Sequence, residues 1–302
     1  MKKLLAMLLA LMMTLSLAAC GGSAQSAQPA ETPAEPETQD AEPEAEVPEP
    51  AGEETEIQVF IAASLNNAFE TLVQMYGERY PNVKITLNAD SSGTLLSQIE
   101  EGYECDIFFS AAAKQMNQLE EDGLAVEGTR VNLLRNEVVL ITWKGSGTAV
   151  TGLENLSEAA SMALADGSVP AGNYTRKALQ AMGVLDAEAT SSEITTETVS
   201  QALGGLEINE CSNVSKVLQA VAEGANEVGT VYYSDAYSDI DRVDILEHIS
   251  ADLTGDIIYP VAQVVNPEAD EAQTAAAADF LAFLQTDEAM AVFETYMFLD
   301  NR

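Results

Sequence analysis

The chain has 302 residues, of which 49 are acidic and 13 are basic, so that its formal net charge is −36. A chain this acidic repels nucleic acid and anionic lipid headgroups, which excludes both as partners recognised by charge. Residues 57–302 are enough for one large domain or two smaller ones.

The first segment carries two lysines and then an apolar run, residues 4–17. A charged start and a short apolar stretch are typical of a secretory signal peptide, and the run is too short for a spanning helix. It ends in Leu-Ala-Ala-Cys, which resembles the bacterial lipobox. This resemblance implies a signal peptide at 1–19 and a lipid on Cys20 that anchors an extracytoplasmic protein to the cell membrane. An ordinary cleaved signal with an incidental cysteine is the alternative.

Residues 20–56 have a different composition from the rest of the chain. Six prolines stand among alanine, glutamate, glutamine and threonine, without a basic or an aromatic residue. Such a segment cannot bury enough apolar surface to offset the entropy lost on ordering. It is therefore predicted to be a disordered acidic Pro/Ala/Glu tether that follows the lipidated cysteine, and an acidic interaction tail is the alternative.

From residue 57 onward, patterns typical of strands and helices alternate. Short β-branched or apolar runs predict strands, and apolar residues at helical spacing predict helices. The alternation predicts an α/β fold with mostly parallel sheets and flanking helices. In chain order we expect a strand at 57–63, a helix at 68–76, a strand at 83–87, a helix at 95–99, a strand at 106–109, a helix at 116–119, a strand at 138–143, helices at 178–182 and 214–221, strands at 229–233 and 259–265, and helices at 275–284 and 289–296.

Four junctions at which a strand or a loop runs into a helix share one chemistry. In open α/β sheets, ligands bind beyond the carboxyl ends of strands, and helices that begin there offer unpaired N–H groups to anions. Each junction also carries hydroxyls or small residues. Helix capping explains any one of them, so that only the set indicates an anion site. The junctions are 62–67, 90–94, 169–173 and 211–215.

The same segments resemble the molybdate-binding proteins of ABC transporters. The resemblance covers nearly all of the chain after the tether, in order, although any single motif is short. It therefore depends on the ordered set rather than on one motif. The stretches that carry it are 59–65, 91–95 with 98–99, 106–111, 169–174, 213–214, 229–236, 259–260 and 293–298.

The resemblance implies a two-lobed, periplasmic-binding-protein-like fold of type II with the anion between the lobes. Lobe I would comprise 57–137 and 261–302, and lobe II would comprise 138–260. In this family neutral donors hold the oxyanion. Carried over to this sequence, the donors are the hydroxyls and amides of Ser64 and Ser92, the backbone N–H groups of Ala171 and Val214, and the hydroxyl of Tyr232, with Ser91 as an additional contact.

The function that the resemblance implies is solute binding for an ABC importer. The protein would capture molybdate, and also tungstate, and deliver it to a permease that works with an ATPase. Molybdenum would be bound only as molybdate; no cofactor and no chemical reaction are expected, and the protein would be a monomer. The alternatives are a carrier of sulfate or phosphate, a surface lipoprotein without a transport role, and an enzyme on the same scaffold.

The residue types fit a fully deprotonated anion. Neutral donors satisfy the acceptors of a dehydrated dianion without a buried counter-charge, and no lysine or arginine stands among the expected contacts. A protonated phosphate would need an acceptor as well, because its O–H would otherwise stay unpaired. Asp90 is the one nearby carboxylate, and we interpret it as a solvated loop acid.

Other chemistry-bearing residues favour ordinary roles. His248 is the only histidine, stands in a polar segment without a nucleophile motif, and is predicted to lie on the surface. Four aspartates at 235, 239, 241 and 244 lack the spacing of a calcium loop and are interpreted as a solvated turn. Cys105 and Cys211 could pair outside the membrane, although spacing alone does not bring them together.

Overall fold

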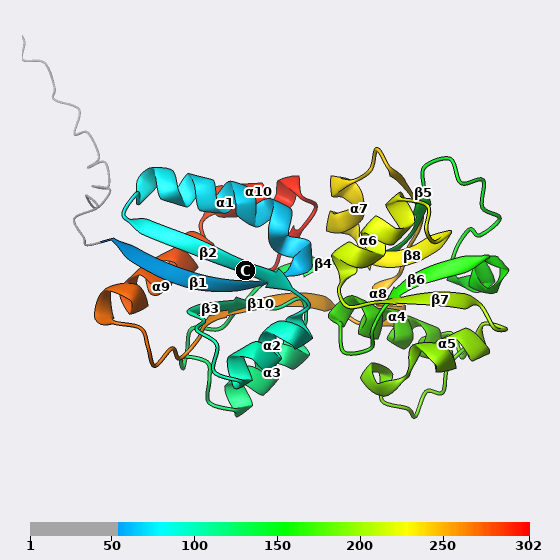
Figure 1. The fold of residues 1–302 in the computed structure, drawn as a ribbon, viewed down its shortest axis with the longest axis horizontal. Coiled ribbons are helices and arrows are strands. Elements are labelled where there is room, and N and C mark those ends of the chain that lie inside the picture. Colours follow the sequence, from blue (N-terminus) through cyan, green and yellow to red (C-terminus); the bar gives the residue numbers. More distant parts are fainter. Residues whose placement is uncertain (1–53) are drawn as a thin grey trace, which may run out of the picture. The chain divides into compact units, whose positions relative to one another are not determined.

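The computed structural model describes residues 54–302, in which two sheets, each flanked by helices, form two lobes (Figure 1). The expected two-lobed α/β fold is confirmed. The predicted signal peptide, Cys20 and the tether as far as residue 53 lie outside the described residues. Among the residues described, no helix combines the length and the apolar character that crossing a membrane requires.

Lobe I contains a sheet of six strands in the order β11-β4-β10-β3-β1-β2. The strands are β1 (Thr55–Ala62), β2 (Val83–Asp90), β3 (Ile107–Phe109), β4 (Val131–Asn136), β10 (Ile257–Gln263) and β11 (Leu299–Asp300). The helices are η1 (Ala63–Leu65), α1 (Asn66–Arg79), α2 (Ser92–Glu100), α3 (Ala113–Glu121), α9 (Glu271–Phe283) and α10 (Asp287–Thr295).

Lobe II contains a sheet of five strands in the order β7-β6-β8-β5-β9. The strands are β5 (Val138–Trp143), β6 (Ser161–Ala165), β7 (Glu207–Cys211), β8 (Val228–Tyr232) and β9 (Val243–His248). The helices are η2 (Leu153–Glu158), α4 (Pro170–Ala181), η3 (Ser191–Glu193), α5 (Thr196–Ala202), α6 (Val214–Ala222), α7 (Tyr233–Ser238) and α8 (Ala251–Thr254).

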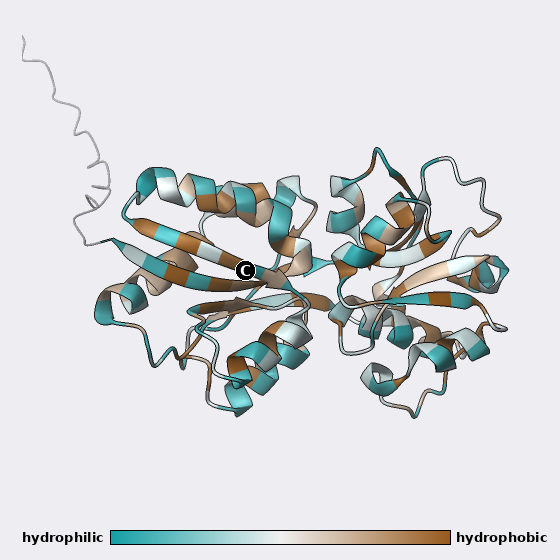
Figure 2. Ribbon diagram, in the orientation of Figure 1, coloured by the Kyte–Doolittle hydropathy of each residue, from teal (hydrophilic) through white to brown (hydrophobic). Residues whose placement is uncertain are grey.

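The inner strands β1, β3 and β10 of the lobe I sheet are largely buried on both faces, to which successive side chains of a strand point in turn. In β3, Phe109 packs edge-on against Phe69 of α1 at 5.9 Å and against Phe293 of α10 at 6.1 Å. Its neighbour Phe108 belongs to a separate cluster of buried apolar side chains, which also contains Leu95 of α2. Figure 2 shows hydrophobic and hydrophilic residues alternating along β1 and along the edge strand β2, none of whose residues is buried. The strands that end at the cavity described below are therefore held between two layers of helices.

Both sheets are mixed, and the expectation of mostly parallel sheets is wrong. β1 is parallel to β2 and β3, and β6 is parallel to β7 and β8. β10 is antiparallel to β3 and β4, and β5 is antiparallel to β8 and β9. A parallel pair needs a crossover that returns the chain to the same end of the sheet. Here the chain passes directly from β4 into β5 of the other lobe, and it later returns from lobe II directly into β10.

The lobe boundaries follow from the strands that carry the chain across. The first crossing is at Glu137, between β4 and β5. The return comes earlier than predicted, because residues 257–260 already pair with β4 in lobe I. Gly255, with a φ of 74°, ends α8 and turns the chain into β10. The strand tolerates Pro260 because its register with β4 shifts between Tyr259 and Pro260.

Lobe I also begins earlier than predicted. Thr55 and Glu56, which we expected at the end of the tether, pair with β2 through Val83 and Lys84. The backbone N–H of Thr55 donates to the carbonyl of Asn82 at 2.9 Å. The pairing partner, rather than local composition, therefore decides where β1 starts.

The two cysteines of the described region are both free and buried. Cys105 lies in the apolar cluster beside α2 and α3 of lobe I, and Cys211 is the last residue of β7 in lobe II. The pairing that the extracytoplasmic setting would allow is therefore not formed. Burial raises the pKa of both thiols, which keeps them protonated.

Candidate ligand-binding site

A small cavity of about 200 Å³ is lined by residues of both lobes. All six residues predicted to contact a ligand lie on its wall. The fold thus brings together segments that are distant in the sequence, since Ser64 and Tyr232 are 168 positions apart. The other lining residues are small, apolar or acidic. The complete lining is Ala62, Ala63, Ser64, Asp90, Ser91, Ser92, Ala111, Val169, Pro170, Ala171, Val214 and Tyr232.

Larger cavities exist elsewhere on the described residues but do not contain the predicted contacts. One of about 740 Å³ lies beside the crossing strands and is lined by Glu137 and His248. Another of about 950 Å³ lies along α2 and α3, near Lys114. Size therefore does not mark the candidate site; the convergence of helix N-termini and hydroxyls does.

Three helices begin at the small cavity, and each leaves backbone N–H groups without an intrahelical partner. In α4 the N-cap residue Val169 has no capping side chain, and Pro170 has no N–H, so that Ala171 supplies the first backbone donor. In α2 and α6 the N-cap side chains accept hydrogen bonds only from the third residue of the helix. The N–H groups of Ser92 and Val214 are therefore the first donors of those helices.

The N-terminus of α4 lies directly against the end of β6. A Cβ atom placed on Gly172 would lie 2.3 Å from the carbonyl oxygens of Ala165 and Asp166, which no real side chain tolerates. Only glycine allows this approach, because it has no Cβ atom. The position of the Ala171 N–H at the cavity thus depends on the residue that follows it.

The hydroxyl of Ser92 is arranged to donate toward the cavity. Its oxygen accepts a hydrogen bond from the backbone N–H of Ala111 at 2.9 Å, and the side chain is fully buried. A hydroxyl has one proton, and that proton stays available for a further acceptor. The adjacent Ser91 differs, because its hydroxyl accepts from the N–H of Thr94 and pairs with the Thr94 hydroxyl at 2.8 Å. Ser92 is therefore the better placed of the two serines.

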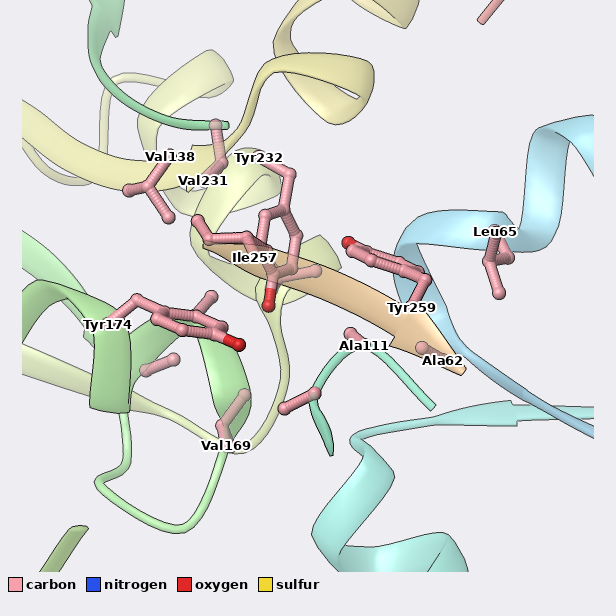
Figure 3. Close-up of a cluster of buried hydrophobic side chains, with 14 of the residues drawn as sticks. Ala62, Leu65, Ala111, Val138, Val169, Tyr174, Val231, Tyr232, Ile257 and Tyr259 are labelled. Carbon is pink, nitrogen blue, oxygen red and sulfur yellow. The ribbon is translucent and has the colours of Figure 1, made fainter. Parts of the chain in front are cut away.

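Tyr232 contributes a buried hydroxyl that has no hydrogen-bond partner among the described residues. It is the last residue of β8, and its side chain is 1% exposed. An unsatisfied buried hydroxyl costs about 1–3 kcal/mol, which a protein accepts where the group has another use. Burial raises the pKa of Tyr232 well above its usual value, so that the phenol remains a donor. Figure 3 shows its hydroxyl end and those of Tyr174 and Tyr259 pointing toward one region.

The cationic side chains that are near the site in sequence are directed elsewhere. Arg176 is fully buried and donates to the backbone carbonyls of Ala165, Gly172 and Ile194. The ammonium of Lys216 bonds the hydroxyl of Ser212 on the surface. No lysine or arginine lines the cavity within the described part of the chain. An anion bound here would be held by neutral donors and helix dipoles.

Asp90 is not the solvated loop acid that we expected. It is the last residue of β2 and lines the cavity. Its Oδ1 atom accepts from the N–H of Ser91 at 2.7 Å and from Nδ2 of Asn213, in lobe II, at 3.0 Å. The carboxylate therefore joins the two lobes at the edge of the site.

Asp235 also corrects the interpretation of the four aspartates as a solvated turn. Its carboxylate is buried and accepts from the backbone N–H of Tyr232 at 3.3 Å. Burial raises the pKa of Asp235 to about 7. Within residues 54–302, no group of three or more histidine, cysteine, aspartate or glutamate side chains is arranged to hold a metal ion. His248 is exposed, as predicted, and bonds Glu137.

Two residues near the site were not among the sequence-predicted contacts. Tyr259 of β10 is fully buried, and its hydroxyl lies 2.9 Å from Oγ of Ser64. Asn136, at the end of β4, donates to the same tyrosine hydroxyl at 3.3 Å. Tyr259 stands in a stretch of the family resemblance, which was the only signal in the sequence; nothing in the pattern around Asn136 marks it.

Known proteins similar to this chain were found at the levels of family, sequence and structure. YvgL of Bacillus subtilis, whose name describes an ABC transporter substrate-binding lipoprotein, is 32% identical over 247 residues, which cover 82% of this chain and 87% of that protein. The molybdate-binding protein ModA of Haemophilus influenzae is 29% identical over 251 residues, which cover 80% and 89%.

A structure from Clostridium difficile, described as the substrate-binding domain of a molybdenum ABC transporter, is 29% identical. It has a TM-score of 0.59, and the match covers 82% of this chain and 100% of that one. The family described as "Bacterial extracellular solute-binding protein" matches residues 57–299. With this match over most of its length, the chain belongs to the bacterial extracellular solute-binding protein family.

Proposed function

We propose that this protein is the solute-binding component of an ABC importer and that it captures molybdate, and tungstate by the same chemistry, between its two lobes. One observation carries the proposal: neutral donors from both lobes line a single cavity. Within residues 54–302, the Tyr232 hydroxyl among them has no hydrogen-bond partner, and no lysine or arginine belongs to the lining. The names of the relatives, a molybdate-binding protein and a substrate-binding lipoprotein, support the same ligand and role.

In this proposal the oxyanion receives hydrogen bonds from five residues. Hydroxyl protons come from Ser64, Ser92 and Tyr232, and backbone N–H groups come from Ala171 and Val214 at two helix N-termini. Ser91 is the additional contact, through its position at the start of α2. The backbone N–H groups can only donate, and each hydroxyl has a proton to donate, which suits an ion that is fully deprotonated near neutral pH.

The mechanism follows from the division of donors between the lobes. A ligand that bonds both lobes stabilises the closed arrangement relative to an open one, because only the closed arrangement completes its set of donors. The permease, together with its ATPase, would then recognise the closed form. No chemical step is involved, so we propose a monomeric carrier that has no cofactor and is not an enzyme.

We further propose that Cys20 carries the lipid and that the acidic tether extends from it to the start of β1. The Leu-Ala-Ala-Cys sequence supports this, as does the lipoprotein name of the relative from Bacillus subtilis. Globomycin, which blocks cleavage of lipoprotein signals, should cause the uncleaved precursor to accumulate. A Cys20→Ala variant should lose membrane retention; retention in that variant would contradict lipid anchoring.

Calorimetric titration of residues 54–302 with molybdate, tungstate, sulfate and phosphate tests the ligand. We expect binding of molybdate and tungstate and weaker binding of phosphate, because Oδ1 of Asp90, the one carboxylate on the cavity wall, already accepts from Ser91 and Asn213. Binding of sulfate in preference to molybdate would keep the carrier role and overturn the ligand. The absence of heat with all four anions would contradict oxyanion capture.

A further inference from the structure

We propose that Asn136 and Tyr259 form a hydrogen-bond relay that holds Ser64 as a donor toward the cavity, and that this relay selects fully deprotonated oxyanions. The inference rests on the proposed function, because it names the selectivity device of the same site. Both are positioning residues: they act on the ligand through Ser64, which lines the cavity, whereas they do not line it themselves.

The relay begins at the side-chain amide of Asn136, whose orientation is set by its neighbours. Its Oδ1 atom accepts the backbone N–H of Glu137 at 2.8 Å. The two protons of Nδ2 therefore point the other way, toward the hydroxyl of Ser234 at 2.9 Å and toward the hydroxyl of Tyr259 at 3.3 Å. An amide nitrogen donates and does not accept. Tyr259 consequently receives a hydrogen bond from this side.

The hydroxyl of Tyr259 transmits this direction to Ser64. The tyrosine is fully buried, and its hydroxyl oxygen lies 2.9 Å from Oγ of Ser64. The phenol has a single proton, and its oxygen already accepts from Asn136. Either hydroxyl can donate in the contact with Ser64; the relay assigns the phenol proton to this contact, so that Ser64 becomes its acceptor. Burial raises the pKa of Tyr259 well above its usual value, so the proton is retained.

Ser64 is thereby left with one role toward a ligand. Its oxygen accepts from Tyr259, and its own proton is free to point into the cavity. Ser92 is oriented in the same way by the N–H of Ala111, so both serine hydroxyls present protons.

A hydrogenphosphate ion needs at least one acceptor. With both serine hydroxyls presenting protons, the only carboxylate on the cavity wall is that of Asp90, whose Oδ1 already accepts from Ser91 and Asn213. Backbone N–H groups can only donate, whereas a hydroxyl can also accept. By fixing the Ser64 hydroxyl as a donor, the relay adds selectivity for deprotonated oxyanions over hydrogenphosphate.

A double-mutant cycle on the full-length chain, purified in detergent, tests the relay. Molybdate and phosphate affinities are measured by calorimetry for wild type, Tyr259→Phe, Ser64→Ala and the double variant. We expect Tyr259→Phe to weaken molybdate binding about 3- to 10-fold in the wild type and less than about 2-fold in the Ser64→Ala background, because residues in one hydrogen-bond network do not act additively. The preference for molybdate over phosphate should fall with the same dependence on Ser64.

Two further variants separate the relay from a general effect on folding. Tyr296→Phe removes a hydroxyl of the same kind, which lies 3.3 Å from the Thr71 hydroxyl between α10 and α1, and should leave both affinities unchanged. Asn136→Asp replaces the donor by an acceptor of the same shape. It should turn the Tyr259 proton away from Ser64 and weaken molybdate binding at least as much as Tyr259→Phe.

Each result decides one question. The relay would be overturned if Tyr259→Phe lowered molybdate affinity equally with and without Ser64, or if Asn136→Asp bound molybdate with full affinity. In either case, molybdate binding by the wild type would still support the proposed function. A wild type that binds none of the oxyanions would overturn the proposed function and the relay together. Thermal unfolding of each variant identifies losses that come from instability.

Discussion

Asn213 donates from Nδ2 to Oδ1 of Asp90 across 3.0 Å, and this bond joins the N-cap of α6 in lobe II to the last residue of β2 in lobe I. The oxygen of the same asparagine side chain accepts the N–H of Lys216. One side chain therefore caps a helix whose first N–H faces the cavity and also bonds the opposite lobe. Ligand affinity and lobe closure should be coupled through it.

The coupling can be tested with Asn213→Ser. Serine is also a good N-cap, so α6 should keep its start, but its side chain is too short to reach Asp90. We expect molybdate affinity to fall by about 1 kcal/mol, roughly 5-fold, with the free energy of unfolding nearly unchanged. Asn213→Asp, which caps equally well and sets a like charge against Asp90, should lose more. Equal affinity of both variants and the wild type by calorimetry would show that the bond does not stabilise the closed form.

Tyr232→Phe isolates the contribution of one hydroxyl. Because this hydroxyl has no partner among the described residues, its removal should not lower the melting temperature. In the complex it would leave a charged acceptor short of a donor, so we expect molybdate binding to weaken by about 1–3 kcal/mol. Calorimetry and thermal unfolding on the same sample separate the two effects. An unchanged affinity would remove Tyr232 from the contacts.

Gly172→Ala tests the close approach of α4 to β6. The added methyl would meet the carbonyl oxygens of Ala165 and Asp166 at 2.3 Å, so the start of α4 must shift. We expect a loss of stability of about 1–3 kcal/mol and a weaker affinity, since the Ala171 N–H moves with it. Gly77→Ala in α1 is the matched control: nothing lies within 4 Å of its added Cβ, and it should stabilise the helix by about 0.5–1 kcal/mol.

Asp235 predicts a pH dependence of stability with a definite sign. Burial raises its pKa from 3.8 to about 7 in the folded state, so between these values the folded protein holds a proton that the unfolded chain has lost. The contribution of Asp235 to stability therefore falls as pH rises from about 4 to about 7 and is constant above, spanning on the order of 4 kcal/mol.

Asp235→Asn should remove this contribution and retain the hydrogen bond, because an amide oxygen can still accept from the N–H of Tyr232. Denaturant unfolding at several pH values compares the two proteins. The stability of the variant relative to the wild type should increase with pH up to about 7. A difference that does not change with pH would mean that the carboxylate is already ionised in the folded protein.

Several strands with a continuous apolar run could be predicted from the sequence, whereas the interior strands β4 and β6 and the polar edge strands β7 and β9 were missed. β1, β5 and β8 are buried runs, and all were expected close to their observed positions. β7 was missed because three of its five residues are glutamate or asparagine, as is usual for a strand with solvent on one side. β9 was missed for a similar reason, since it lies at the other edge of the same sheet.

The six expected contacts came from the family resemblance. Five of them also stand at the junctions where helices begin, whereas Tyr232, the last residue of β8, came from the resemblance alone. Residues that act through tertiary neighbours gave no such signal. Asn136 and Tyr259 meet only because β4 and β10 are adjacent strands from distant parts of the chain. Asp235 resembled its exposed neighbours in composition, and only the packing of α7 shows that it is buried.

The most direct test of the central claim is a crystal structure grown with molybdate, with diffraction measured at the molybdenum absorption edge. The account predicts one strong anomalous peak in the cavity between Ser64, Ser92 and Tyr232, with anion oxygens at about 2.7–3.1 Å from these hydroxyls and from the N–H groups of Ala171 and Val214. A peak at any other place, or density for a different anion that molybdate does not displace, would contradict it.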